Sequence, residues 1–242
     1  MKLSTILLGI FSLSLMALYS CEKDNMEGPD ARFFGSIKDS LDGSLVETDL
    51  INGSSIDAFE QGFESPVLQR WVIMNTGEFR NNLVFANTYN FKLQNGNFFP
   101  YDVNGVEIRK GDNQRDFQVV PYLRLRDVQI NYDQATKKIT ATVKILPGKP
   151  GVKLRTVRLY AFSDQYVGEP VKFNIAGGAT IQNFTPSKTI EEETVQLSID
   201  ATAHANFLIS GREYFFRIGA LADVSGVGTI RHNYAPIVKI KL

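Results

Sequence analysis

The chain has 242 residues, with 26 basic and 26 acidic side chains, so its formal net charge is zero. Proteins that bind nucleic acids need a basic surface to release counterions from phosphates, so this balance argues against nucleic acid as a partner. It also argues against a polybasic segment held at an anionic membrane surface. The hydrophobic content of 43% is typical of a folded globular protein.

The N-terminus predicts an exported lipoprotein. An apolar run from Ile6 to Leu18 follows Met1-Lys2, and it is shorter than the ~20 residues that a membrane-spanning helix requires. We therefore interpret residues 1–20 as a signal peptide. The run ends in Leu18-Tyr19-Ser20-Cys21, which resembles the bacterial lipobox and predicts lipidation of Cys21, the only cysteine in the chain. A diacylated cysteine supplies the two acyl chains that stable membrane anchoring requires. The alternative is an ordinary secretory signal with a chance cysteine.

Residues 21–30 form a polar segment that we interpret as a lipidated tether. The sequence Glu22-Lys23-Asp24-Asn25 is partly acidic and resembles the surface-export signal of Bacteroidota lipoproteins. This resemblance implies an outer-membrane lipoprotein exposed at the cell surface. Attachment at the periplasmic face is the alternative.

Apolar and polar residues alternate through most of the remaining chain, which is typical of β-strands with one buried face. The clearest alternating segments are 89–93, 139–145, 195–199 and 214–220. Asn-Gly and Asp-Gly pairs separate such segments and favour tight turns, as at Asp42-Gly43, Asn95-Gly96 and Asn104-Gly105. Only Asp200–Ile209 has a helix-like pattern, of one or two turns. The sequence predicts an all-β fold with two consecutive β-sandwich domains after the lipoprotein signal peptide.

Pro121 suggests the domain boundary, because proline is poorly suited to a central strand. Residues 31–120 resemble a transthyretin-like, carboxypeptidase-regulatory sandwich, on the strength of Gly35–Asp39, Asp42–Val46, Thr76–Phe79 and Tyr89–Leu93. Residues 121–242 resemble an immunoglobulin or fibronectin type III sandwich, in which Gly211–Ile218 would supply the penultimate strand.

Five sequence segments together resemble an uncharacterised family of Bacteroidota surface lipoproteins, catalogued as a domain of unknown function. The segments are Cys21–Asn25, Gly28–Asp30, Gly77–Asn81, Phe85-Ala86 and Asn233–Pro236. The resemblance covers essentially the whole mature chain and implies an association with glycan-utilisation loci. It implies partners in polysaccharide capture, such as a polysaccharide and an outer-membrane transporter complex. It carries no established site residues.

The sequence offers little for metal binding or catalysis. The two histidines, His204 and His232, are far apart and lack the spacing of a zinc site, so we expect them to be solvent-exposed or capping. No Gly-x-Ser-x-Gly or Walker motif is present, and we interpret Glu191–Glu193 as a solvated loop. We therefore expect no cofactor, no metal and no enzymatic activity. A hydrolase with paired carboxylates is the hardest alternative to exclude, because sequence spacing does not reveal their separation in space.

Aromatic side chains are the remaining candidates for a ligand site, because planar rings bind the apolar faces of sugars. The possible ligand platform consists of Trp71, Phe99, Tyr101, Tyr160 and Tyr166. Trp71 lies in a run that is apolar on both faces, which favours a core or domain-interface position. For Phe99 and Tyr101, the alternative is a loop that folds back onto its own hydrophobic residues.

We therefore predict a non-catalytic, membrane-anchored lipoprotein that acts as an accessory glycan-binding or scaffold component of a polysaccharide-uptake system. The first alternative is a structural or adhesive protein that binds another protein, which predicts an apolar patch or an open sheet edge. The second is a carboxylate-based hydrolase, which predicts two acids in a cleft with raised pKa values.

Overall fold

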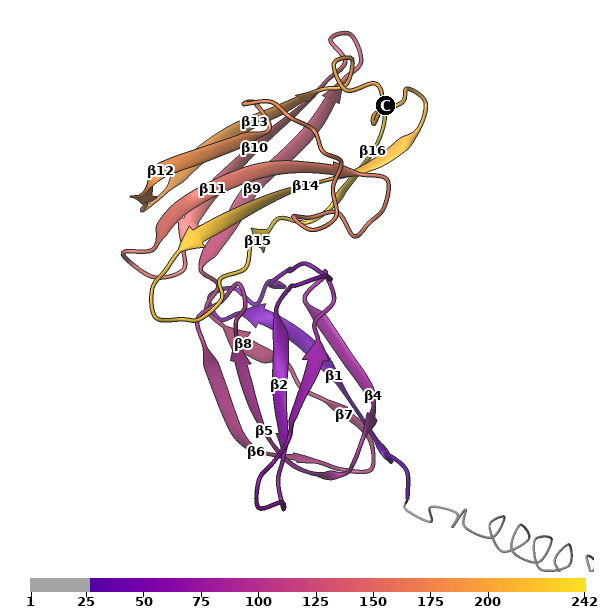
Figure 1. The fold of residues 1–242 in the computed structure, drawn as a ribbon, viewed down its shortest axis with the longest axis vertical. Helices are drawn as coiled ribbons and strands as arrows, with labels where there is room; N and C mark the ends of the chain where they lie inside the picture. The colour runs from indigo at the N-terminus through magenta and orange to yellow at the C-terminus, as the bar shows by residue number, and fades with distance from the viewer. Residues whose placement is uncertain (1–26) are drawn as a thin grey trace, which may run out of the picture.

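The structure is a computed structural model that describes residues 27–242. Strands β1–β8 and β9–β16 form two domains stacked end to end along the long axis of the molecule (Figure 1). The predicted all-β fold with two domains is confirmed. The described residues contain no helix: within the segment Asp200–Ile209, Asp200 ends a strand and residues 201–207 form turns. Residues 27–242 therefore offer no helix able to cross a bilayer. The predicted signal peptide and Cys21 lie outside the described residues.

The N-terminal domain packs two sheets around an aromatic core. One sheet contains β4 (Glu78–Val84), β1 (Ala31–Asp39), β7 (Gly111–Gln114) and β8 (Phe117–Val119), with β7 and β8 parallel to β1. The other contains β3 (Leu68–Val72), β2 (Ser55–Glu60), β5 (Asn87–Gln94) and β6 (Tyr101–Ile108), all antiparallel. Phe33 of the first sheet stacks on Phe91 of the second with 5.3 Å between ring centroids. The aromatic residues thus join the two sheets through a shared core.

The C-terminal domain also packs two sheets around one apolar core. The first sheet has the order β13 (Glu193–Asp200), β10 (Lys138–Pro147) and β9 (Leu123–Asp133). The second has the order β12 (Ile181–Thr189), β11 (Lys153–Phe162), β14 (Glu213–Asp223) and β15 (Asn233–Tyr234), and β16 (Val238–Lys241) also pairs with β14. The residues predicted from alternation to be buried in β10, β13 and β14 do form this core.

The connection between β11 and β12 (residues 163–180) folds back over the second sheet of this domain. Its residue Val167 is buried against Tyr160 of β11 and Tyr234 of β15. Phe173 donates its backbone N–H to the Ala161 carbonyl at 2.9 Å. The outer face of this sheet is therefore partly covered.

The predicted turns have the backbone conformation that their residues favour, with one exception. Gly43 and Asn95 have φ values of 75° and 55°, in the left-handed region used by tight turns. The predicted turn at Asn104-Gly105 is wrong, because both residues lie inside β6. There the register with β5 shifts, and Gly105 donates its N–H to Asn90 Oδ1 at 2.8 Å. Asn-Gly here marks a β-bulge, which requires the same positive φ.

Candidate functional site at the domain junction

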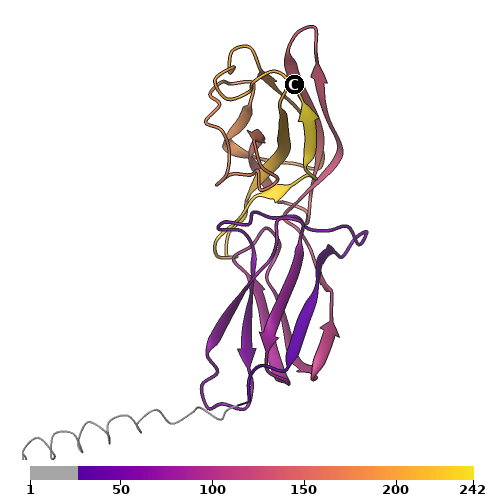
Figure 2. The same ribbon diagram turned by 90° about the vertical axis from the view of Figure 1, so that its right-hand side faces the viewer.

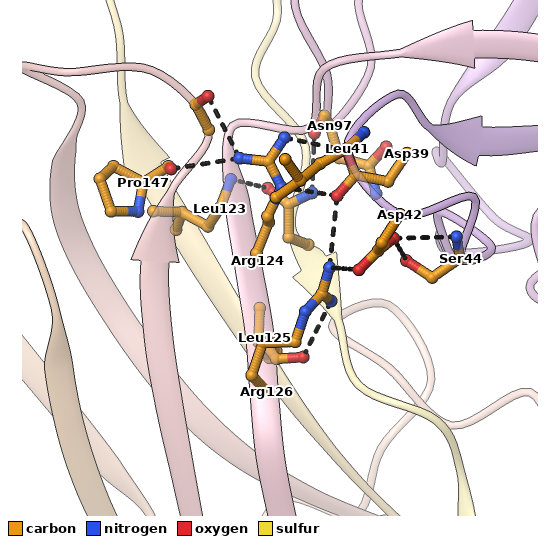
Figure 3. Close-up of polar contacts among 12 residues, drawn as sticks. Asp39, Leu41, Asp42, Ser44, Asn97, Leu123, Arg124, Leu125, Arg126 and Pro147 are labelled. Carbon is orange, nitrogen blue, oxygen red and sulfur yellow. Dashed lines mark hydrogen bonds and ion pairs between the residues drawn. The ribbon is translucent and has the colours of Figure 1, made fainter.

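A buried ion pair joins the two domains at the start of β9 (Figure 3). Arg124 donates from Nε and Nη2 to the two carboxylate oxygens of Asp39, at 2.6 and 2.9 Å. Its Nη1 reaches the carbonyls of Pro147 and Gly148 at 3.3 and 3.2 Å. Arg126 pairs with both Asp39 and Asp42. Bidentate pairing of this kind fixes geometry as well as charge, so it sets how the Asp39 turn sits against β9.

A second arginine, Arg217 of β14, is completely buried at the junction. It donates to Glu47 Oε2 at 2.7 Å and to the carbonyls of Thr48 and Asn75 at 3.0 Å each, all in the N-terminal domain. In its own domain it donates to the Ala235 carbonyl at 3.0 Å. One guanidinium group thus satisfies acceptors from both domains.

Asparagine and tyrosine side chains complete the junction. Asn233 donates to the Asn97 carbonyl at 2.7 Å, and Asn97 donates to the His232 carbonyl at 3.1 Å. The Tyr234 hydroxyl donates to Asp49 Oδ2 at 2.6 Å. Buried polar groups contribute stability only when they are paired. Here each domain donates hydrogen bonds to acceptors in the other domain.

The junction shifts the pKa values of its buried acids and its histidine. Burial raises the pKa of Asp49 to about 6, although the Tyr234 hydroxyl and Arg217 oppose the change. Burial also raises the pKa of Glu47, against the pull of Arg217. Burial lowers the pKa of His232 to about 4. Glu47 and Asp49 are already bound by Arg217 and Tyr234, so their shifts are explained by their position in the junction.

Three hollows open beside the junction: two of about 320 and 330 Å³, and a third of about 530 Å³ lined by Leu41 and by C-terminal residues that include Leu146, Pro147 and Ile190. The first, of about 320 Å³, includes Asp39, Leu45, Arg124, Arg126 and Pro236 in its lining. Its charged groups are those that pair across the junction (Figure 3). A ligand here would have to compete with these ion pairs.

The second hollow, of about 330 Å³, combines Phe99 with Lys149, Lys153, Asp223 and Ser225; we call it the Phe99 hollow. Phe99 comes from the N-terminal domain, and its ring meets Tyr122 edge-on with 4.9 Å between centroids. The Lys149 ammonium lies 4.1 Å from the centroid of the Phe99 ring. Within residues 27–242, the side chains of these two lysines, Asp223 and Ser225 make no hydrogen bond or ion pair. The Phe99 hollow therefore offers donors and acceptors beside an aromatic ring.

Family models match both halves of the chain. The N-terminal domain of a protein family of unknown function, DUF3823, matches residues 32–120, and its C-terminal domain matches residues 123–239. The chain belongs to the DUF3823 family. The resemblance to an uncharacterised Bacteroidota family is thereby confirmed.

Solved structures extend this assignment. A protein from Bacteroides uniformis ATCC 8492, described as a candidate carbohydrate binding protein, is 48% identical with a TM-score of 0.85, and the match covers 89% of this chain and 100% of that one. A DUF3823 protein from Parabacteroides merdae ATCC 43184 is 18% identical, with a TM-score of 0.69 and coverage of 89% and 100%. At 18% identity, the match to the Parabacteroides merdae protein shows only that the two proteins share a fold. No curated protein matches the sequence.

The five aromatic residues proposed as a ligand platform do not come together in this DUF3823 chain. Trp71 is buried in the N-terminal core, and Tyr160 is buried with its hydroxyl donating to Glu169 Oε2 at 2.8 Å. Neither can serve as a surface platform, because strand alternation directs Trp71 inward and the 163–180 connection covers Tyr160. Tyr101 is exposed, and Phe99 and Tyr166 are half-buried. Of the five, Phe99 lines the Phe99 hollow.

The expected exposure of the histidines is wrong for His232. Its ring is partly buried beside Tyr160 and Tyr234, with centroids 6.4 and 5.9 Å away. His204 is half-buried in the turns after β13. Glu191 and Glu192 are exposed, as the loop interpretation expects, but that interpretation is wrong for Glu193, which begins β13 and pairs with Lys188 at 2.5 Å. Among residues 27–242, no cluster of three or more His, Cys, Asp or Glu side chains could hold a metal ion.

Sequence reasoning missed Lys149, Lys153 and Asp223. The available signal was the turn-rich segment Pro147-Gly148-Lys149-Pro150-Gly151, which predicts a loop but not what the loop faces. Only the packing of the two domains brings Phe99 to this loop.

Proposed function

We propose that this DUF3823 chain is a non-catalytic lipoprotein that binds a glycan as an accessory component of a polysaccharide-uptake system. The Phe99 hollow is the observation that carries the proposal, because it sets unpaired polar side chains around an aromatic ring. The 48% identity to a candidate carbohydrate binding protein supports the same class of ligand.

Binding in the Phe99 hollow would begin with displacement of Lys149. Its ammonium now lies over the Phe99 ring, and such a contact is worth only ~0.5–1 kcal/mol at an exposed site. A pyranose can therefore take its place against the ring. The displaced ammonium and Lys153 would donate to sugar oxygens, while Asp223 would accept from hydroxyl groups.

Calorimetry of the mature protein with a panel of plant, host and microbial glycans tests this site. Lys149→Ala and Asp223→Asn should each weaken binding about 10- to 100-fold, because a hydrogen bond to a charged group contributes ~1.5–3 kcal/mol. The matched controls are Lys92→Ala, whose ammonium lies 5.7 Å from the Phe59 ring, and Asp102→Asn, on the neighbouring strand. Equal losses in variants and controls, or no loss in either, would place binding elsewhere.

The anchor is tested separately. Lipidation of Cys21 predicts that Cys21→Ala releases the protein from membranes into the soluble fraction. A Cys21→Ala protein that stayed in the membrane fraction, with its N-terminus unprocessed, would refute the lipoprotein assignment. Accessibility of the wild-type protein to protease on intact cells distinguishes the cell surface from the periplasmic face.

One observation favours the alternative of a protein partner. Strand β3 lies at the edge of its sheet, and its outer face exposes Leu68 and Val72, followed by Met74. An apolar edge strand is a common template for pairing with another chain. If no glycan binds, pull-down of the lipidated protein from membranes should recover a partner that Val72→Lys prevents from binding.

A further inference from the structure

The end of the N-terminal domain farthest from the junction gathers several connections around the start of β1; we call it the distal end (Figures 1 and 2). Asp30, just before β1, accepts the Ala86 N–H at 2.9 Å and pairs with Lys110 at 3.0 Å. Gln61, after β2, accepts from Asn87 Nδ2 at 3.0 Å. The β2–β3, β4–β5 and β6–β7 connections therefore lie where the described chain begins.

The distal end exposes large apolar side chains from the β2–β3 and β4–β5 connections and from the end of β4. The exposed fractions are 61% for Phe63, 78% for Val67, 75% for Leu83 and 44% for Phe85. Leu41, Ile51 and Val72, elsewhere in the N-terminal domain, are comparably exposed, whereas Ile209 is the only such side chain among residues 123–242. Clustered exposed apolar groups of this kind indicate an interaction site.

Most charged groups around the distal end pair with one another, although exposed Glu64, between Phe63 and Val67, makes no ion pair within residues 27–242. Arg32 pairs with Asp112 at 2.5 Å, Lys110 with Asp30 at 3.0 Å, and Arg109 with Glu107 at 3.1 Å. Such pairing leaves little net field to attract a strongly charged partner. The distal end thus fits a neutral amphipathic environment, such as the interface between lipid headgroups and acyl chains.

The short length of chain between Cys21 and Glu27 identifies the membrane as the partner of the distal end. If Cys21 carries the lipid, the six steps from Cys21 to Glu27 span at most ~20 Å even when fully extended, at ~3.3–3.6 Å per residue. The distal end must then stay close to the membrane that holds the acyl chains. We propose that Phe63, Val67, Leu83 and Phe85 insert into this lipid interface. The molecule would then stand on its N-terminal domain, with the C-terminal domain and the Phe99 hollow away from the membrane.

This inference rests on the proposed lipidation of Cys21, and spin labelling of the lipidated full chain tests the two separately. Cys21 is the only native cysteine, and lipidation would consume its thiol. A cysteine introduced at Ser65, between Phe63 and Val67, can then be labelled alone. The matched control is Ala135→Cys, in the β9–β10 turn at the opposite end of the molecule. The labelled proteins are reconstituted into phosphatidylethanolamine–phosphatidylglycerol vesicles.

Power saturation in the presence of oxygen or a water-soluble nickel complex reports the depth of each label. We expect the label at position 65 to meet oxygen more often than nickel, and the label at 135 to show the reverse. In the presence of both Phe63→Ser and Leu83→Ser, the label at position 65 should meet the nickel complex more often than oxygen, as a label in water does. Added salt should leave the depth unchanged, because insertion is apolar.

Two results overturn the inference while the anchor stands. In the first, the protein floats with the vesicles, but nickel reaches position 65 as freely as position 135. In the second, neither reagent reaches position 65, which means that another protein copy covers it. A protein that fails to float with the vesicles refutes the anchor itself, and the inference falls with it.

Discussion

The junction buries an acid and a base whose pKa values shift in opposite directions. Burial raises the pKa of Asp49 from 3.8 to about 6, and it lowers the pKa of His232 from 6.5 to about 4. Both changes favour the neutral side chain, because burial penalises charge. The two groups should therefore have opposite effects on how stability depends on pH.

For Asp49, the folded protein keeps a proton between pH 4 and 6 that the unfolded chain has released. The free energy of unfolding therefore falls as the pH rises through this window. For His232, the unfolded chain binds a proton between pH 4 and 6.5 that the folded protein rejects, so the free energy of unfolding rises with pH. For each group, the pKa difference between the folded and the unfolded protein changes the free energy of unfolding by about 3 kcal/mol across its window, at about 1.4 kcal/mol per pH unit. In the wild-type protein the two contributions nearly cancel.

Single substitutions should expose each contribution. Asp49→Asn keeps an acceptor for the Tyr234 hydroxyl but cannot ionise, so its free energy of unfolding should rise by about 3 kcal/mol from pH 4 to 6.5, relative to wild type. For His232→Gln, the free energy of unfolding relative to wild type should fall by a similar amount from pH 4 to 6. Urea unfolding at half-unit pH steps measures both slopes. Two variants that both parallel the wild-type curve, or that change with the same sign, would refute this account of the junction.

Further substitutions test the packing around the junction and the N-terminal core. Arg217→Met leaves Glu47 buried without its partner, so it should cost about 3–5 kcal/mol. Calorimetry should then show Tm lowered by roughly 6–20 °C. The control is exposed Arg155→Met, which should lower the free energy of unfolding by less than about 1 kcal/mol. An equally small loss for Arg217→Met would contradict the role of Arg217. Trp71→Ala should cost about 3–5 kcal/mol in urea unfolding because it empties part of the core; a weakened glycan affinity at unchanged stability would show instead that Trp71 is a ligand platform. Gly168→Ala would place a Cβ 2.1 Å from Asp49 Oδ1, so it should cost about 1–3 kcal/mol, and unchanged stability would show that this segment can move away from Asp49.

The strands and cores could be predicted because their signal is local. Side chains in a strand alternate between two faces, so Tyr89, Phe91 and Leu93 had to share one side whatever their partners. All three are buried in the N-terminal core. The turn at Asn104-Gly105 was mispredicted because a bulge and a hairpin turn can require the same backbone angles at one residue. Only the pairing of β6 with β5 distinguishes them.

The junction could not be predicted, because its contacts join distant parts of the chain. Alternation places Arg217 on the outer face of β14, which is correct for the sheet. That face is nevertheless buried, because the 163–180 connection and the N-terminal domain cover it. Its partner Glu47 lies 170 residues earlier. Strand periodicity describes how a residue faces its own sheet, and it contains nothing about a second domain packed on the other side.

The same junction connects domain packing to the proposed glycan site. Arg124 binds Asp39 of the N-terminal domain and, through Nη1, the carbonyls of Pro147 and Gly148, directly before Lys149. It therefore helps to position the turn that carries Lys149 over Phe99. Arg124→Lys keeps the charge but loses the bidentate geometry, so it should weaken glycan binding although Arg124 does not line the Phe99 hollow.

Calorimetric Kd values for Arg124→Lys, compared with Arg155→Lys as an exposed control, measure this effect. We expect a severalfold increase in Kd for Arg124→Lys alone, because binding to a less ordered turn costs additional entropy. An unchanged Kd in a variant whose unfolding midpoint has dropped would show that the hollow keeps its shape without the ion pair. The position of Lys149 would then depend on the β10–β11 turn itself, and the arginine would serve stability alone.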